Sequence, residues 1–335
     1  MPGRRTNLAL LVLLAAGFVT GGLAYGTGTS WGRWVVAAHG IVGFAIVALS
    51  PWKRPIVRRG LKRERAGRVP SVVFTFVVIA TVTFGVTHAS GVLRSLGPVT
   101  AMQLHVGAAL VAVPLAVWHV VARRVRVYRS DLSRRRLLRA GAVLGGAGIA
   151  YAATEGLVHL ASLPGADRRF TGSFERGSFD PEGMPVTQWL DDSVRDIDPA
   201  AWFLRLRVGD VTRNLSYDQI AEFEDRVTAV LDCTGGWFAE QEWEGILVSR
   251  LVGDTAHGRS IAVGSATGYG RRFPVDAAGD LLLATRVGGA PLSAGHGRPA
   301  RLVASGRRGF WWVKWVTSIE VSDVPWWWQS PFPLT

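Results

Sequence analysis

The fold of the N-terminal half is decided by residues 102–122, MQLHVGAALVAVPLAVWHVVA, an apolar run without acidic or basic side chains other than histidine. A run of about 20 apolar residues is long enough to cross a bilayer as a helix. Four more apolar runs flank it, at Leu8 to Tyr25, Trp34 to Leu49, Pro70 to Val86, and Leu137 to about Leu163. We therefore expect an N-terminal α-helical transmembrane bundle of about five helices.

The charges of the 335-residue chain divide into two halves. Residues 1–162 hold 20 Lys and Arg with three acidic residues, whereas residues 163–335 hold 18 Lys and Arg with 22 acidic residues. The basic residues of the first half gather before the first run, from Lys53 to Arg68, and from Arg123 to Arg139. By the positive-inside rule, the N-terminus is cytoplasmic, and five crossings place the C-terminal half outside.

This pattern predicts a multi-pass plasma-membrane protein in contact with lipid, with an extracytoplasmic C-terminal domain. The alternative, basic patches that bind nucleic acid, leaves the alternation of basic and apolar segments unexplained, so we expect no nucleic-acid partner.

Histidines inside apolar spans are costly and mark functional positions. His105 and His119 are 14 residues apart, which on a helix puts them within about 40° of one face and roughly 21 Å apart. The fourth span thereby resembles the two-haem membrane cytochromes b of the cytochrome b561 and formate-dehydrogenase-gamma type. The resemblance implies axial histidine ligands for a b haem.

We expect His39, at a similar depth on the outer side of the second span, to pair with His105 on one haem. His88 and His159 are reserve ligands near the outer surface, and His119 would hold an inner haem only with a partner that no other span supplies as histidine. The alternative is that these histidines cap helices or form hydrogen bonds across the bundle.

The segment Ser133 to Arg139, SRRRLLR, precedes a small, apolar run from Ala140 to Ala153. It resembles a twin-arginine export signal with Leu and Arg in place of the usual Phe and Lys, although ordinary positive-inside charge would give the same residues. Ala150-Tyr151-Ala152 has the small-x-small form of a cleavage site, but we favour an uncut anchor. The expected domains are a four-helix cytochrome b-like domain at 1–130, a signal and anchor helix at 131–163, and an outer domain at 164–335.

The outer half has the pattern of an α+β, mostly β, domain with one core. Residues 164–188, rich in Gly, Pro and Ser, predict an extended linker, and Ser216 predicts the N-cap of a short helix. Alternation and apolar runs bounded by turn residues predict strands. They lie at 203–208, 227–231, 260–264, 281–286, 300–304 and 311–321.

Cys233 is the single cysteine of the chain, which excludes an internal disulfide and a cysteine-cluster metal site. It ends an apolar strand and is followed by Thr234-Gly235-Gly236, where the backbone can approach a ligand closely. A thiolate is a soft ligand for a transition metal. Taken alone, the segment favours the alternative of a buried small hydrophobe.

Longer motifs change that balance, because they resemble the molybdopterin-binding domain of the sulfite oxidase family over about residues 165–325. The resemblance implies a sulfite-oxidase-like fold in which Cys233 binds molybdenum. The resemblance does not extend to the family's C-terminal dimerisation domain, so the sequence provides no argument for a dimer. The motifs are Leu206 to Val211, Leu231 to Trp237, Trp243 to Ile246, Gly289 to Leu292, His296 to Val303, and Val313 to Trp315.

The methionine-sulfoxide-reductase branch of that family implies further contacts with molybdopterin. At the matching positions, His296, Arg301 and Lys314 would contact the pterin or its phosphate, and Thr267, near Tyr269, would lie at the cofactor mouth. A guanidinium fork and an ammonium group are suitable donors to a phosphate outside a P-loop. Surface charge is the alternative for each cation.

These features predict a membrane-anchored molybdenum oxidoreductase that transfers an oxygen atom on a small S- or N-oxide substrate, or on sulfite. Electrons would be exchanged through a b haem with the quinone pool or a membrane electron-transfer partner, as in the two-protein arrangement of the sulfoxide-reductase branch. For sulfite, Arg271 and Arg272 would supply cations at the metal. The alternatives are a non-enzymatic membrane protein whose degenerate outer domain binds a partner, and a cytochrome that only carries electrons.

Overall fold

The computed structural model describes residues 2–61, 68–125, 127–128, 131, 133–188, 192–253 and 258–333. It forms two compact units, which are treated separately below. The helical unit comprises Met1–Tyr25 and Ser30–Gly172, and the sheet unit comprises Gly26–Thr29 and Ser173–Thr335. The helix expected as a separate anchor therefore belongs to the helical unit, and the boundary lies at 172/173.

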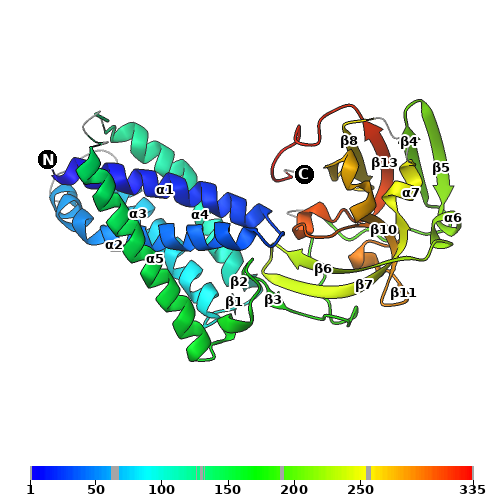
Figure 1. The fold of residues 1–335 in the computed structure, drawn as a ribbon, viewed down its shortest axis with the longest axis horizontal. Coiled ribbons are helices and arrows are strands. Elements are labelled where there is room, and N and C mark those ends of the chain that lie inside the picture. Colours follow the sequence, from blue (N-terminus) through cyan, green and yellow to red (C-terminus); the bar gives the residue numbers. More distant parts are fainter. Residues whose placement is uncertain are drawn as a thin grey trace. The chain divides into compact units, whose positions relative to one another are not determined.

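The helical unit contains five helices that are long and apolar enough to cross a membrane. Figure 1 shows them as one bundle, completed by a short hairpin of β1 and β2. The elements are α1 (Pro2–Gly26), α2 (Gly32–Leu61), α3 (Arg68–Ser90), β1 (Ser95–Leu96), β2 (Val99–Thr100), α4 (Ala101–Ala122), α5 (Arg134–Leu160) and the 3-10 turn η2 (Pro164–Asp167). Helix α2 continues through Pro51 and Pro55, so the basic residues Lys53 to Arg59 lie in a helix rather than in the expected loop.

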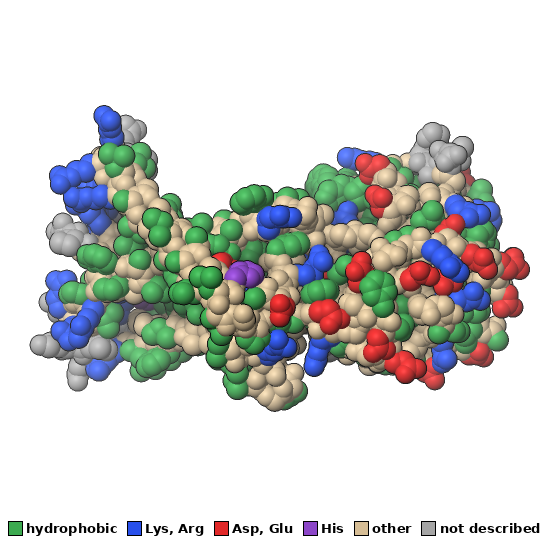
Figure 2. Space-filling view, turned by 60° about the horizontal axis from the view of Figure 1, so that its bottom comes forward, with side chains coloured by type: hydrophobic (Ala, Val, Ile, Leu, Met, Phe, Trp, Pro, Cys, Tyr) green, Lys and Arg blue, Asp and Glu red, His purple; other side chains and the backbone are tan. Residues whose placement is uncertain are grey.

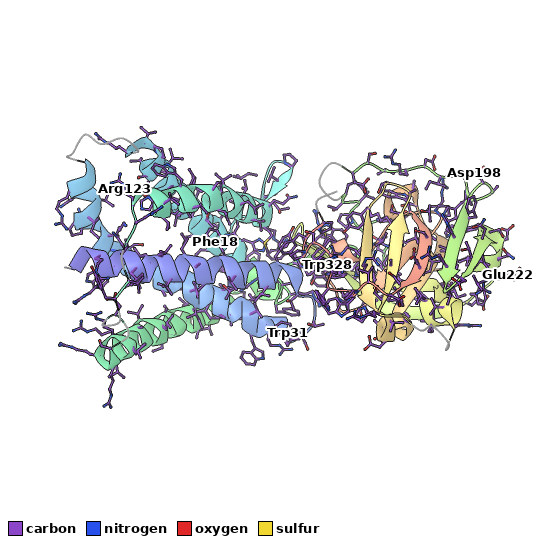
Figure 3. All side chains as sticks on the ribbon, turned by 90° about the horizontal axis from the view of Figure 1, so that it is seen from above. Phe18, Trp31, Arg123, Asp198, Glu222 and Trp328 are labelled. Carbon is purple, nitrogen blue, oxygen red and sulfur yellow. The ribbon has the colours of Figure 1, made fainter. Side chains whose placement is uncertain are left out.

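The surface of the helical unit is apolar along its length and basic at one end. Between 0 and 11% of each apolar window is buried. Figure 2 shows Lys and Arg side chains gathered at one end of the unit, and Figure 3 shows Arg123 and Trp31 at opposite ends. At the basic end, the Asp131 carboxylate lies 2.7 Å from Arg4 and 2.5 Å from Arg136, which joins the start of α1 to the start of α5.

The sheet unit is built from two sheets around one core. One has the order β5-β4-β13-β8-β9, and the other has the order β11-β10-β7-β3 with β12 on β10 and β6 on β7. Long strands β6 and β7 run antiparallel side by side (Figure 1). The strands are β3 (Phe174–Glu175), β4 (Phe203–Val208), β5 (Val211–Ser216), β6 (Asp225–Cys233), β7 (Trp237–Leu247), β8 (Ser260–Ser265), β9 (Gly270–Pro274), β10 (Leu281–Val287), β11 (Ala290–Pro291), β12 (Arg301–Ala304) and β13 (Val316–Ser322).

Short helices connect these strands, and the core lies between the two sheets. The helical elements are α6 (Tyr217–Ala221), α7 (Val248–Val252), η3 (Val275–Asp280), η4 (Ala294–His296) and η5 (Gly309–Trp311). Leu204 and Ile319 from one sheet, and Trp243 and Leu283 from the other, are fully buried in it. Burial of such large apolar side chains is the main stabilising contribution to a domain of this size.

Several expectations from the sequence are confirmed. Strand β4 alternates exposed and buried residues as expected. Ser216 caps α6, accepting a hydrogen bond from the Gln219 amide while the Gln219 side chain accepts one from the Ser216 amide. Strands are also found at the expected positions of β6, β8, β10 and β12.

Two expectations are wrong. The strand expected at 311–321 begins only at Val316, because Trp311 ends η5 and the next residues form bends. The expected linker at 164–188 contains η2 and β3, and β3 pairs in parallel with β7. Thr171, Ser173 and Phe174 are buried there. Residues 164–172 belong to the helical unit, and β3 forms an edge of a sheet in the other unit.

Candidate functional site

Cys233 is the last residue of β6, opposite Trp237 of β7. A tight turn joins the two strands, and Gly236 in this turn has φ +94°, a conformation that favours glycine. The Gly235 amide donates to Cys233 Sγ at 3.3 Å. Burial raises the pKa of the Cys233 thiol, so the thiolate needs a positive partner such as a metal ion.

A buried ion pair fixes the backbone beside Cys233. Arg308 Nη1 lies 2.6 Å from Asp232 Oδ1, and both side chains are at most 3% exposed. Arg308 Nη2 donates to the Cys233 carbonyl at 3.2 Å, and Ser173 Oγ donates to Asp232 Oδ1 at 2.6 Å. Arg308 was not among the predicted site residues, although a buried Asp next to the cysteine requires a cationic partner.

Cys233 opens into a cavity of about 680 Å³ including its mouth. His296, Arg301 and Lys314 line it together with Cys233, so the structure brings four predicted site residues into one cavity. The other lining residues include Thr187, Asp192, Trp237, Tyr269, Phe310, Trp312 and Trp315.

Arg301 is a buried cation without a carboxylate partner among the described residues. Its side chain is 1% exposed, and its Nη1 donates to the His296 carbonyl at 3.2 Å. The guanidinium lies over the rings of Trp243 and Trp312, at 5.0 and 5.5 Å from their centroids. Its Nε is buried with no hydrogen-bond partner in the described part of the chain. Burial lowers the pKa of Arg301, which indicates a site that gains stability when an anion binds.

Lys314 adds a second cation to the same cavity. Its Nζ donates to the Gly295 carbonyl at 2.6 Å and to the Thr187 carbonyl at 2.9 Å. Burial, with the nearby charge of Arg301, lowers the pKa of Lys314 to about 7. Both cations thus pay a desolvation cost that an anionic ligand would offset.

The ring nitrogens of His296 are both used within the protein. Its Nε2 donates to the Met184 carbonyl at 3.2 Å, and its Nδ1 therefore accepts from Ser293 Oγ at 2.9 Å. Burial and the charges of Arg301 and Lys314 lower the pKa of His296 to about 4. The neutral ring shapes the cavity wall.

Three other residues considered from the sequence lie outside the cavity lining. The Thr267 hydroxyl contacts Ser265 Oγ at 3.2 Å and Asp192 Oδ2 at 3.4 Å, beside the mouth. Arg271 lies over the Trp311 ring at 4.1 Å and donates to the Ser330 carbonyl. Arg272 donates to Ser322 Oγ at 3.2 Å. The structure therefore brings neither arginine to Cys233.

In the helical unit, the predicted haem ligands His39 and His105 lie together. Their ring centroids are 5.9 Å apart. His105 Nδ1 is 2.7 Å from the Thr81 carbonyl and His39 Nδ1 is 3.2 Å from Thr20 Oγ1. Each of the two rings is therefore held through its Nδ1 atom. An imidazole held through one nitrogen, with the other nitrogen available, is the usual arrangement of a metal ligand.

Glycines allow the helices to approach these two rings. A Cβ at Gly21 would lie 3.0 Å from His39 Cε1, and a Cβ at Gly85 would lie 3.0 Å from His105 Cε1. Larger residues at either position would push the rings away, so the helix packing itself defines the positions of the imidazoles.

The other histidines of this unit are not brought to that pair. His88 Nε2 forms a hydrogen bond with the Gly172 carbonyl at 2.7 Å, so this nitrogen is not available to bind a metal. His159 is exposed near the end of α5. His119 lies beside the Phe74 ring at 5.4 Å, and no second histidine accompanies it in the described helices.

Comparison with known proteins identifies the chemistry of the sheet unit. Residues 191–328 match the family described as oxidoreductase molybdopterin binding domain. This range contains all strands from β4 to β13. The sheet unit therefore carries a molybdopterin-binding oxidoreductase domain, and the protein is an enzyme.

No curated protein matches the chain. Among solved structures, it is similar to the crystal structure of the sulfane dehydrogenase SoxCD from Paracoccus pantotrophus, with 24% sequence identity and a TM-score of 0.37. The match covers 39% of this chain and 40% of that one, so the chain corresponds to less than half of that protein's length.

The cavity has the donor set that a molybdenum–pterin cofactor requires. Cys233 supplies a soft sulfur ligand, and the buried Arg301 and the partly buried Lys314 supply two cations for a phosphate. This arrangement argues against the alternative of a degenerate domain that only binds a partner, because unpaired buried cations are unfavourable unless a ligand neutralises them.

Proposed function

We propose that the protein is a membrane-anchored molybdenum-cofactor oxidoreductase that transfers an oxygen atom on a small S- or N-oxide substrate. The observation that carries this proposal is the cavity in which Cys233 is accompanied by the buried Arg301 and the partly buried Lys314, two cations that form no ion pair with a carboxylate among the described residues. Cys233 Sγ would hold the metal, and the two cations would hold the pterin phosphate. The bound cofactor supplies two-electron oxygen-atom exchange.

Reduction of the substrate is the proposed direction, and sulfite oxidation is the second candidate. Sulfite oxidation calls for cations at the metal, whereas Arg271 and Arg272 bind other parts of the sheet unit. In the reductive direction, a sulfoxide takes up two electrons and two protons to give a sulfide and water. A quinol would supply both, and its oxidation to a quinone balances the reaction.

The helical unit would anchor the enzyme and carry its electrons. Five apolar helices with basic residues at one end support a multi-pass arrangement in the plasma membrane, with that end cytoplasmic and the sheet unit outside. His39 and His105 would hold a b haem through their Nε2 atoms, because both Nδ1 atoms are bonded within the bundle. The haem supplies one-electron exchange between the quinone pool and the sheet unit.

Metal and haem analysis of the purified full chain tests the proposal. We expect about one molybdenum per chain, a b-type pyridine haemochrome spectrum, and quinol-dependent reduction of at least one member of a panel of sulfoxides and N-oxides, with sulfite tested in the opposite direction. The Cys233→Ser variant should lose molybdenum and activity but keep the haem spectrum. Native protein without molybdenum would overturn the enzyme mechanism, and native protein without haem would overturn the electron route.

A further inference from the structure

Three consecutive tryptophans lie on the surface of the sheet unit. Trp326, Trp327 and Trp328 are 38, 59 and 70% exposed, and they follow β13 in the red segment of Figure 1. The other described tryptophans of this unit are buried or partly buried, as is usual for so large a side chain. A cluster of exposed indoles therefore indicates an interaction surface.

The backbone around these tryptophans is held against β9. Gln329 Oε1 accepts a hydrogen bond from the Arg272 amide at 3.0 Å, and Gln329 Nε2 donates to the Arg272 carbonyl at 2.9 Å. The Trp328 amide donates to the Pro325 carbonyl at 2.9 Å, which closes a turn. We call residues 325–332 the tryptophan loop. Because its backbone is already ordered, little conformational entropy is lost when the indoles bind a partner.

Two arginines beside this loop carry positive charge that no described carboxylate pairs with. Arg271 and Arg307 both lie over the Trp311 ring, at 4.1 and 4.7 Å from its centroid, and Arg271 donates to the Ser330 carbonyl of the loop at 3.0 Å. Asp280 acts on Arg307 only from beyond ion-pair distance. Burial lowers the pKa of both arginines. The tryptophan loop therefore adjoins uncompensated positive charge, which favours an anionic partner.

The same part of the sheet unit contains the residue at which an apolar helix ends. Gly26 is the last residue of α1 and belongs by its contacts to the sheet unit. A Cβ at Gly26 would lie 3.8 Å from Phe332 Cε1 of the tryptophan loop, and Thr27 forms an antiparallel bridge with Arg307. Apolar spans end at the lipid headgroups, the region in which tryptophan is favoured. The tryptophan loop therefore lies beside a residue that a membrane-spanning α1 places at headgroup level.

We infer that the tryptophan loop docks on lipid, with the indoles of Trp327 and Trp328 among the headgroups of anionic phospholipids and Arg307 attracting their phosphates. The inference rests on the membrane anchorage in the proposed function and does not depend on molybdenum or haem. An indole is apolar with one N–H donor, and it therefore suits the boundary between acyl chains and headgroups. Arg307 is partly exposed and can reach an anion, whereas Arg271 is 3% exposed and contributes only its electric field.

The experiment measures where two of the indoles lie in the full chain reconstituted into vesicles. The fluorescence of the native protein minus that of Trp327→Phe/Trp328→Phe isolates these two side chains. In phosphatidylglycerol vesicles, lipids brominated near the top of their acyl chains should quench most of this difference, and acrylamide in the water should quench little of it.

Phe203→Trp, added to the double variant, is the matched control. Phe203 is 53% exposed on β4, which two strands separate from β9 in the same sheet. The fluorescence that this substitution adds should be quenched by acrylamide and not by brominated lipid.

The same assay tests the contribution of charge. Arg307→Gln should lower the ratio of docked to undocked loops about fivefold, the effect of one cation at an anionic surface. Arg307→Lys keeps the charge and should recover most of the quenching. Vesicles of phosphatidylcholine, which carry no net charge, should also give weaker quenching of the native protein.

The outcomes separate lipid docking from the proposed function. A fluorescence difference that only acrylamide quenches overturns lipid docking, including the case in which the loop binds another protein. Equal quenching by brominated lipid in the native protein and Arg307→Gln overturns the role of Arg307. Both results are obtained on protein that floats with the vesicles, so they leave the proposed function standing. A native chain that does not float with the vesicles overturns the membrane anchorage itself.

Discussion

The two units of the protein follow opposite rules of burial. In the helical unit, large apolar side chains such as Val19 and Ile149 face outward, while the imidazoles of His39 and His105 meet inside. In the sheet unit, the apolar side chains face inward, and Arg301 and Arg308 are buried among them. Each candidate site lies where polar side chains are buried in the interior of its unit. Buried polar groups are unfavourable unless a ligand or a protein group forms hydrogen bonds or ion pairs with them.

The two buried arginines of the sheet unit sharpen this comparison. Arg308 has a carboxylate partner at 2.6 Å, so its charge is balanced within the protein. Arg301 lies over two tryptophan rings and has no such partner in the described residues. Arg308 is therefore part of a structural ion pair, whereas the charge of Arg301 would be compensated by a bound anion.

The largest effect is expected from substitutions in the segment that resembles a twin-arginine export signal. Arg134 and Arg135 are exposed at the start of α5, whereas Arg136 is paired with Asp131. Replacing Arg134 and Arg135 by lysine keeps all positive charge but removes the twin arginines, so we expect the sheet unit to stay in the cytoplasm. Protease accessibility in spheroplasts measures this. Arg136→Lys is the matched control, and normal export of the double variant would show that positive-inside charge alone directs the chain.

A nearly complete loss is also expected at the histidine pair. His39→Ala and His105→Ala should each abolish the b-type absorbance, since a low-spin haem needs both axial ligands. Molybdenum content should not change, because Cys233 lies in the other unit. Difference spectra and elemental analysis of the same preparations measure both. A b-type spectrum that survives both substitutions would assign the haem to other ligands.

The two arginines should respond in opposite ways when changed to methionine. Arg308→Met leaves the buried Asp232 carboxylate without its cationic partner, which should destabilise the sheet unit by about 3–5 kcal/mol. Arg301→Met should leave the cofactor-free protein at least as stable and should prevent cofactor retention. Denaturant unfolding of cofactor-free protein in detergent measures the first effect, and molybdenum content measures the second.

Arg207→Met is the control for the stability measurement. Arg207 pairs with Glu320 at 2.9 Å with half of its side chain exposed, and such surface pairs contribute about 0–1 kcal/mol. An equal loss of unfolding free energy in Arg207→Met and Arg308→Met would contradict the contrast between surface and buried ion pairs.

The smallest effect is expected from pH. The pKa of Lys314 is about 7 in the cofactor-free cavity, so the ammonium form is lost as the pH rises above 7. Binding of an anion requires that form, and its affinity should therefore fall by up to about tenfold per pH unit between pH 7 and 8.5. His296, with a pKa of about 4, stays neutral over this range.

Titration calorimetry with sulfate, an anion that does not itself ionise in this range, measures the pH dependence on cofactor-free protein. Lys314→Arg keeps its charge and should give a nearly constant affinity. A fall in affinity that persists in Lys314→Arg would assign the pH dependence to another group.

The sequence predicts those parts of the fold that depend on local patterns. Apolar runs and basic segments identify the five helices, and alternation identifies β4. Strand β7 was missed because its residues, from Trp237 to Leu247, mix charged and apolar types on a strand that is paired on both sides. The burial of Ser173 and Phe174 was missed because it depends on contacts with β6 and β7, about sixty residues later in the chain.

The site was predictable in its residue types and not in its network. The resemblance to the sulfite oxidase family implied Cys233, His296, Arg301 and Lys314 as site residues, and the structure places all four on one cavity. Their proposed roles remain predictions. Arg308 and Ser173 belong to no local pattern, because they meet Asp232 only through tertiary contacts. Pairwise spacing in a sequence carries no information on such contacts.

The bridge between Thr27 and Arg307 has a consequence for the order of assembly. Thr27 belongs to the short connection between α1 and α2, which the ribosome makes early, and Arg307 is made near the end of synthesis. The backbone of the early segment can therefore form this bridge only after the late residues have been made. Since residues 26–29 belong to the sheet unit, a substitution that unfolds this unit, such as Arg308→Met, should open the connection between α1 and α2 to proteolysis.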